Sequence, residues 1–232
     1  MNIAVRKGEG VFEDRTNQKI ILKTEDVIVK NILIDIKLSL LYIIDSLMAL
    51  IPSKFFFTKG VGVHTKQMMA FELALRDAGV NKCNLVKISS IIAPGCQRIS
   101  PEEGIKLLKA GEVTFAVIAE SITNEPGQLV GAGIGMAQPH DKTIHGYLTE
   151  VDSAIGRTAE DIMQDSEEMA IENLVTEWGY EDFDGDSVWE ANKKEYDIHN
   201  RKIAVDHVVQ TARGAENNQF TVVFAAAVFI YD

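Results

Sequence analysis

Two adjacent serines, Ser89 and Ser90, lie within the apolar sequence NLVKISSIIAPG at residues 84–95. We interpret this segment as a buried β-strand that runs into a turn, where an unpaired hydroxyl group is costly. The pair could do chemistry, because a serine hydroxyl beside the preceding carbonyl group can attack it and convert the amide to an ester. β-Elimination of that ester cuts the backbone, and the dehydroalanine at the new N-terminus hydrolyses to a pyruvoyl group. Strain and exclusion of water both favour such a cyclisation.

A simpler interpretation is that the two serines only end a strand, since this dipeptide is common. Spacing alone favours the simpler interpretation. The chemical interpretation therefore depends on the rest of the sequence.

Two other motifs suggest ligand sites but lack the pattern that each site requires. The run GAGIGMA at residues 131–137 would suit a dinucleotide only if a helix opened after it. Its glycines instead alternate within a β-patterned segment, which indicates close approach of another backbone. His140 and His145 are five residues apart and would face opposite sides of a strand, so we predict turn residues and no shared metal.

The sequence FDGD suggests a calcium-binding loop, but the rest of the loop pattern is absent. An EF-hand loop that begins at Asp182 requires glycine at its sixth position and glutamate at its twelfth. Those positions hold Ser187 and Lys193. We therefore predict a solvated acidic turn.

Composition argues against several classes of partner and location. The net charge of -11 over 232 residues disfavours nucleic acid, which requires a basic face. Cys83 and Cys96 are too few for a disulfide framework, so we expect reduced thiols in a cytoplasmic protein. The most apolar early segment is interrupted by Asp35, Lys37 and Asp45, which predicts neither a membrane span nor a secretory signal.

Residues 1–47 differ from the rest of the chain, with scattered charge and weak periodicity. From Met48 onward the pattern becomes regular. We predict an N-terminal extension outside the core fold at residues 1–47 and one domain at residues 48–232. The alternative is that residues 1–47 form a genuine strand-and-helix arm.

Helix and strand signals alternate through the predicted domain. One helix is expected to end at Gly79, and two others begin at the caps Ser100 and Thr158 and end at Gly111 and Gly179. Strands outnumber helices and are often joined by short turns, which predicts an α+β fold with mainly antiparallel sheets covered by helices. The predicted strands are residues 83–88, 112–121, 128–138, 146–151, 202–213 and 219–232.

Several segments together resemble the pyruvoyl-dependent arginine decarboxylases. They are AFELALRDAGVNKCNLVKISSIIAP, TNEP, HGYLTE and the terminal VFAAAV, and NLVKISSI is the most specific. The resemblance runs from about Leu50 to the C-terminus and is weakest between about Val151 and Gly214, while residues 1–47 have no family counterpart. It implies an αββα four-layer sandwich that assembles as a trimer, with active sites between subunits.

The resemblance also implies that the chain cuts itself between Ser89 and Ser90. The β chain would end at Ser89, and the α chain would begin with a covalent pyruvoyl group derived from Ser90, with no metal and no pyridoxal phosphate. Asn84 matches an asparagine that assists processing and lines the family's site. Glu150 matches its catalytic glutamate, and a carboxyl group that holds its proton is a suitable donor to the carbanion left by decarboxylation.

Substrate recognition follows from the same resemblance. Glu72 occupies the position of a substrate-binding aspartate found in some family members, and a carboxylate suits a guanidinium group because it accepts two parallel hydrogen bonds. Ile91, next to the cleavage pair, is the second predicted substrate-binding residue. An exposed helix residue is the alternative interpretation of Glu72, and a surface residue on an edge strand is that of Glu150.

These implications predict decarboxylation of L-arginine to agmatine and CO2 in polyamine biosynthesis. The protein would act as a homotrimer of cleaved αβ protomers, with any larger assembly left open, and without nucleic-acid or membrane partners. Two alternatives stay open: the same chemistry on another amino acid, and an uncleaved trimeric binding or scaffold protein.

Overall fold

The computed structural model describes residues 4–6, 9–13, 19–23, 33–39, 50–180, 189–190, 195–198 and 200–231. The chain divides into two compact units, Met1–Leu50 and Ile51–Asp232. In the first unit, β1 (Ala4–Arg6), β2 (Glu9–Glu13) and β3 (Lys19–Lys23) form an antiparallel sheet, and residues 33–39 form a helix. The division into an extension at residues 1–47 and a domain at residues 48–232 stays a prediction.

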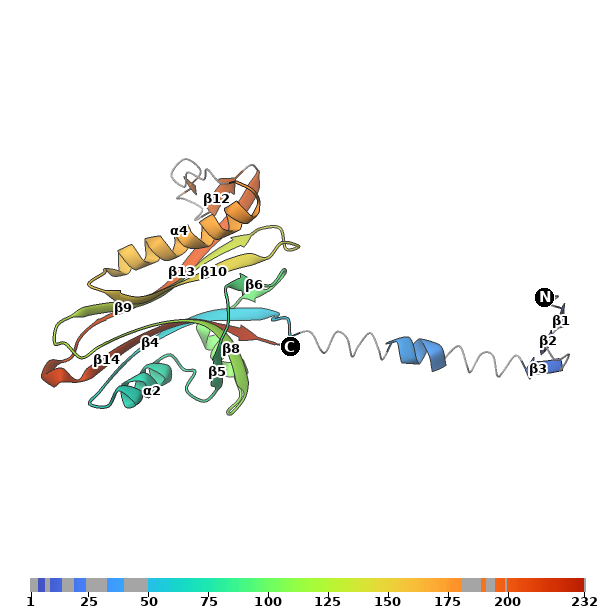
Figure 1. Cartoon of the computed structure of the whole chain (residues 1–232), viewed down its shortest axis with the longest axis horizontal. Helices are drawn as coiled ribbons and strands as arrows, with labels where there is room; N and C mark the ends of the chain where they lie inside the picture. The colour runs from blue at the N-terminus through green and yellow to red at the C-terminus, as the bar shows by residue number, and fades with distance from the viewer. Residues whose placement is uncertain are drawn as a thin grey trace. The chain divides into compact units, whose positions relative to one another are not determined.

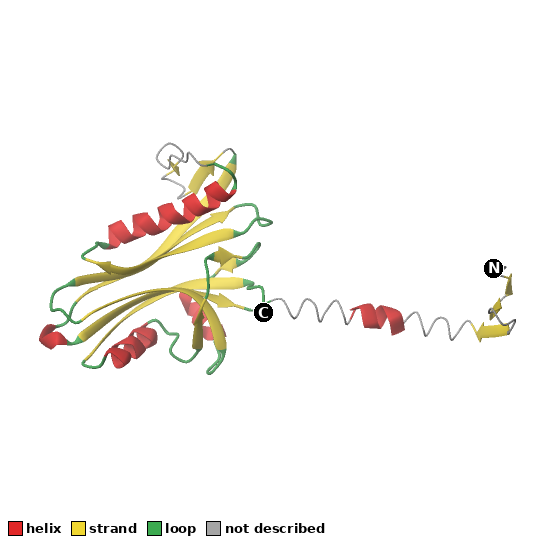
Figure 2. Cartoon of the chain, viewed as in Figure 1, coloured by secondary structure: helices red, strands yellow, loops and turns green. Residues whose placement is uncertain are grey.

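The second unit contains two facing sheets between helices (Figures 1 and 2). One sheet has the strand order β5-β8-β14-β4-β7, and the other has the order β11-β12-β13-β9-β10-β6. Neighbouring strands pair antiparallel except β5 with β8 and β4 with β7. The elements are β4 (Lys54–His64), α2 (Gln67–Asp77), β5 (Asn84–Lys87), β6 (Ile91–Ile92), β7 (Gln97–Arg98), α3 (Pro101–Leu107), β8 (Val113–Thr123), β9 (Leu129–Pro139), β10 (Gly146–Ile155), α4 (Ala159–Glu177), β11 (Trp189–Glu190), β12 (Glu195–Ile198), β13 (Arg201–Arg213), the 3-10 turn Glu216–Asn218 and β14 (Phe220–Ile230).

Three apolar layers hold this sandwich together. The central layer lies between the two sheets and includes the buried side chains of Phe55, Ile134 and Leu148. A second layer packs α2 and α3 against the five-stranded sheet, and a third packs α4 against the six-stranded sheet (Figure 1). The α+β prediction of mainly antiparallel sheets covered by helices is therefore confirmed.

The predicted helix caps are also found. The Ser100 hydroxyl accepts a hydrogen bond from the Glu103 N–H at 3.2 Å, and Thr158 forms a reciprocal capping box with Asp161. Positive φ angles follow α2 and α4 at Gly79 and Gly179, as expected for helix ends. The prediction that the second helix reaches Gly111 is wrong, because α3 ends at Leu107 where the backbone of Leu108 becomes extended.

The alternating glycines of residues 131–137 lie on β9 and let α4 approach the sheet. A Cβ atom added to Gly135 would come within 2.2 Å of the Ser166 carbonyl group, and one added to Gly131 would meet Ile162. The prediction of close backbone approach is confirmed. On β4, a strand that we did not predict, Gly60 and Gly62 allow the same close approach of α2 to the sheet.

Several smaller predictions are also tested by the structure. His140 and His145 both lie in the connection between β9 and β10, and Cys83 and Cys96 are free. Burial raises the pKa of Cys96 to about 11. The acidic turn predicted at residues 182–187 lies outside the described residues. Among the described residues, no helix has the length and apolar character needed to cross a lipid bilayer.

Candidate active site

Ser89 and Ser90 lie where the chain crosses from one sheet to the other. Before them, the Ile88 N–H donates to the Ala116 carbonyl oxygen at 3.0 Å and continues the pairing of β5 with β8. After them, β6 pairs with β10 in the six-stranded sheet (Figure 1). The Ser90 carbonyl oxygen accepts a hydrogen bond from the Leu148 N–H on β10 at 2.7 Å. The two serines therefore form a short bridge whose two ends are held by different sheets.

The prediction that the serines lie within a buried strand is wrong. The strand β5 ends at Lys87, and in this single chain Ser89 is exposed and Ser90 is half-buried. The physical reason is that β5 is an edge strand, with one neighbour, β8, among the strands that the structure describes. Of the two apolar residues of β5, Val86 is 39% exposed in one protomer and Leu85 is half-buried.

Glu150 lies on β10, two residues beyond the partner of Ser90. Alternate residues of a strand share a face, so Glu150 points to the same side as the buried Leu148, toward the other sheet. The side chain is 29% exposed, and its carboxylate is 3.7 Å from the Lys87 ammonium group at the end of β5. The structure thus brings the predicted cleavage pair and the predicted catalytic glutamate to one edge of the sandwich.

Lys87 and Asp152 belong to the same edge and were missed in the sequence. The Lys87 ammonium group lies 3.2 Å from one Asp152 carboxylate oxygen, and the other oxygen accepts the Glu120 backbone N–H at 2.8 Å. A β-bulge between Val151 and Ala154, with Ser153 at a φ of 51°, increases the bend of β10 beside Asp152. The sequence contains a signal for both residues. Asp152 lies two positions after Glu150, a spacing that puts both side chains on one face of a strand, and Lys87 is a charged residue within an apolar run.

Asn84 begins β5, at the opposite end of the strand from the serines. Asn84 lies three positions before Lys87, which corresponds to roughly 10 Å of extended chain. Its side-chain amide donates to the Gly111 carbonyl oxygen at 2.9 Å. The structure therefore does not bring Asn84 to Ser90 within one protomer, and its role in catalysis stays a prediction.

The two predicted substrate-binding residues lie in different places. Ile91 directly follows the serine pair on β6 and is 43% exposed. Glu72 lies on α2, which covers the outer face of the five-stranded sheet, and its carboxylate accepts a hydrogen bond from Arg76 at 2.9 Å. Within one protomer, Glu72 and Glu150 therefore belong to different layers.

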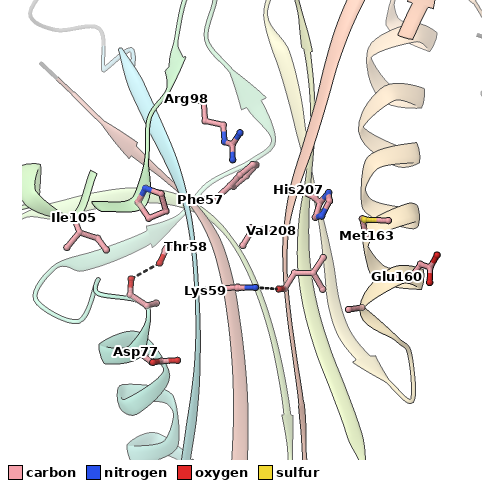
Figure 3. Close-up of a pocket in the computed structure, with 14 residues that line it drawn as sticks. Phe57, Thr58, Lys59, Asp77, Arg98, Ile105, Glu160, Met163, His207 and Val208 are labelled. Atoms are coloured by element: carbon pink, nitrogen blue, oxygen red, sulfur yellow. Dashed lines mark hydrogen bonds between the residues drawn. The ribbon is translucent and has the colours of Figure 1, made fainter. Parts of the chain in front are cut away.

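A pocket of about 760 Å³ opens at the opposite edge of the sandwich, between β4 and β13 (Figure 3). Its lining includes Phe57, Arg98 and His207, and Lys59 spans it by donating to the Val209 carbonyl oxygen at 3.0 Å. Neither the serines nor Glu150 line this pocket. Over the described part of the chain, no cluster of three or more His, Cys, Asp or Glu side chains is placed to hold a metal ion.

Comparison with known proteins identifies the family. The model of the family described as pyruvoyl-dependent arginine decarboxylase matches residues 54–232. A protein of Chloroherpeton thalassium named "Probable pyruvoyl-dependent arginine decarboxylase" is 43% identical over 183 residues, which cover 79% of this chain and 100% of that protein. A Nitrosopumilus maritimus protein named "Pyruvoyl-dependent arginine decarboxylase" is 37% identical over 181 residues, 78% of this chain and 98% of that protein. The chain therefore belongs to the pyruvoyl-dependent arginine decarboxylase family.

Proposed function

We propose that this protein decarboxylates L-arginine to agmatine and CO2, with a covalent pyruvoyl cofactor that it makes from Ser90, and that the agmatine feeds polyamine synthesis. The observation that carries the proposal is the serine pair at the crossing between the sheets, with Glu150 on the strand that binds Ser90. The names of the relatives support arginine as the substrate.

The cofactor would form in three steps that need only the chain and water. The Ser90 hydroxyl oxygen attacks the Ser89 carbonyl carbon, the peptide C–N bond breaks, and the released nitrogen takes up the hydroxyl proton. Loss of the Ser90 Cα proton and of the Cβ–oxygen bond then frees Ser89 as a carboxylate and leaves dehydroalanine. One water molecule converts the dehydroalanine to the pyruvoyl group and ammonia.

The flanking strands support a cut at this bond. The new C-terminus would stay on the five-stranded sheet, since β5 pairs with β8 and Ile88 with Ala116. The new N-terminus would stay on the six-stranded sheet, since Ser90 and β6 both bind β10. Each fragment therefore keeps its own backbone partners, so the fold does not depend on the bond that is lost.

In the decarboxylation itself, we assign proton transfer to Glu150. The pyruvoyl carbonyl group supplies the electron sink for loss of the substrate carboxylate as CO2. Glu150 then delivers a proton to the substrate carbon, which requires its carboxyl group to stay within hydrogen-bond reach of that atom. Glu150 lies two residues after Leu148, whose N–H binds the Ser90 carbonyl oxygen, and this position supports the role.

We further infer that a homotrimer of cleaved αβ protomers completes the site. The exposed positions of Ser89, Val86 and Ile91 in one protomer support a neighbouring subunit at this edge. Glu72 of that neighbour would then bind the substrate guanidinium in place of its present partner, Arg76. This arrangement accounts for the separation of Glu72 from Glu150 within one chain.

Product analysis with four candidate substrates tests the proposal. Purified enzyme is incubated separately with arginine, lysine, histidine and aspartate, and CO2 and the amine product are measured. We expect a clear preference for arginine and release of agmatine, and a Glu72→Gln variant should raise KM for arginine. Glu102→Gln, which changes an exposed glutamate at the start of α3, should leave KM unchanged. A clear preference for lysine, histidine or aspartate contradicts the assignment.

A further inference from the structure

Lys87 joins the two strands that carry the proposed chemistry. It ends β5, two residues before Ser89, and its ammonium group lies between two carboxylates of β10. The distance is 3.7 Å to Glu150 and 3.2 Å to Asp152. The ion pairs therefore run across the same gap between the sheets that the serine pair bridges.

Asp152 in turn is fixed from the five-stranded sheet. One of its oxygens binds Lys87, and the other accepts the backbone N–H of Glu120 on β8 at 2.8 Å. The bulge at Ser153 lies directly after it in the chain. Since a backbone donor on β8 cannot rotate away as a side chain can, Asp152 has a defined position from which to hold Lys87.

We propose that Lys87 is a positioning residue that sets the placement of Glu150 relative to Ser90. Its ion pair with Asp152 and its 3.7 Å contact with the Glu150 carboxyl group hold the end of β5 against β10, so that the serine bridge and the Glu150 carboxyl group keep one relative position. Asp152 holds the Lys87 ammonium group in place, so that Lys87 does not move together with the Glu150 side chain. The inference rests on the proposed function and adds two residues to the machinery of its site.

Fold stability does not explain this arrangement well. The side chains of Lys87 and Asp152 are 48% and 41% exposed, and exposed ion pairs contribute little to stability because water and salt screen them. A misplacement of about 1 Å at a reacting group, in contrast, can reduce a rate by roughly 100-fold. The contacts of Lys87 therefore matter more for geometry than for folding.

Replacement of Lys87 by methionine, in the full-length chain, tests the inference. Lys87→Met keeps a long unbranched side chain and removes the charge. We expect a normal thermal midpoint, slower self-cleavage followed by mass spectrometry, and a kcat that is roughly 10–100-fold lower with little change in KM. Lys87→Arg should restore both the cleavage rate and kcat, because a guanidinium group can bind the same two carboxylates.

The chain offers a matched control at the opposite edge of the sandwich. Lys59 also bridges the two sheets, through the Val209 carbonyl oxygen, but lies away from the serines. Lys59→Met should cleave and turn over like the wild type. If Lys87→Met behaves like Lys59→Met, or if Lys87→Arg fails to restore kcat, the positioning role is wrong.

A second variant keeps the test decisive if Lys87→Met does not fold. Asp152→Asn leaves Lys87 and Glu150 in place and removes the anchor, so slower cleavage and a lower kcat with unchanged KM are expected. Wild-type values in this variant contradict the inference. The failure of the proposed function and the failure of the positioning role can be told apart. An uncleaved wild type contradicts the proposed function. Normal cleavage in all Lys87 and Asp152 variants contradicts only the positioning role.

Discussion

The carbonyl oxygen of Ser90 accepts a hydrogen bond from the Leu148 N–H at 2.7 Å. This contact fixes Ser90 on β10, the strand that carries Glu150 two residues later. It therefore relates the residue that would become the cofactor to the residue that would donate the proton, and it does so through backbone atoms. The contact relates the backbones of the two residues and does not involve their side chains, so the two roles can be tested separately by substitution.

Glu150→Gln should separate cleavage from decarboxylation. The amide keeps the size of the side chain but cannot supply the proton, so we expect cleavage and assembly to persist while kcat falls by roughly 10²–10⁴-fold. Turnover is measured as CO2 released from arginine, with Glu102→Gln as the control for loss of a remote glutamate. Near-normal turnover in Glu150→Gln would remove Glu150 from the mechanism.

Gly135→Ala should loosen α4 from the six-stranded sheet. The added Cβ atom would come within 2.2 Å of the Ser166 backbone, so either α4 or β9 must move. Overpacking of this kind costs about 1–3 kcal/mol, and the clash with backbone rather than side-chain atoms favours the upper end. Denaturant unfolding of the purified variant measures the loss, and an unchanged midpoint would show that α4 does not pack this closely.

Tyr147→Phe should change the acid stability of the protein through Glu177. The Tyr147 hydroxyl donates to the Glu177 carboxylate at 2.6 Å and His145 lies 3.0 Å from it, and these two contacts lower the pKa of Glu177 below its ordinary value of 4.5. A carboxyl group whose pKa is lower in the folded state stabilises the fold above the ordinary pKa, and this contribution disappears as the pH falls through the lowered pKa.

The variant removes the Tyr147 hydrogen bond, which is the largest single cause of the lowered pKa of Glu177. We therefore expect the pKa of Glu177 to rise toward its ordinary value, measured by NMR titration of its carboxyl carbon. Acid unfolding followed by circular dichroism should begin at a higher pH than in the wild type. A carboxyl titration that is the same in both proteins would show that Tyr147 does not hold Glu177 in solution.

Local features of the fold could be predicted because short segments determine them. The caps at Ser100 and Thr158 satisfy N–H groups only three residues away, and the glycines of β9 lie in a recognisable alternation. The strand β4 was missed because Gly60 and Gly62 weaken its β-pattern, and their reason becomes visible only with α2 packed against them.

The reacting residues of the site could be predicted from the sequence, but the residues around them and their exposure could not. Ser89, Ser90 and Glu150 were found from motifs, whereas the exposure of Ser89 follows from the place of the serines after an edge strand, which no local pattern reveals. Lys87 and Asp152 meet only because β5 and β10 belong to different sheets that face each other. Contacts between residues 65 positions apart require the topology, and the topology came from the structure.

A denaturing mass spectrum of the purified protein shows directly whether the chain cuts itself between Ser89 and Ser90. We predict two fragments that meet at the Ser89–Ser90 bond, with a pyruvoyl group at the N-terminus of the larger one. Ser90→Ala should give one intact chain, because the attacking hydroxyl is absent. A single intact mass for correctly folded wild-type protein, or cleavage that persists in Ser90→Ala, would contradict formation of a pyruvoyl group from Ser90.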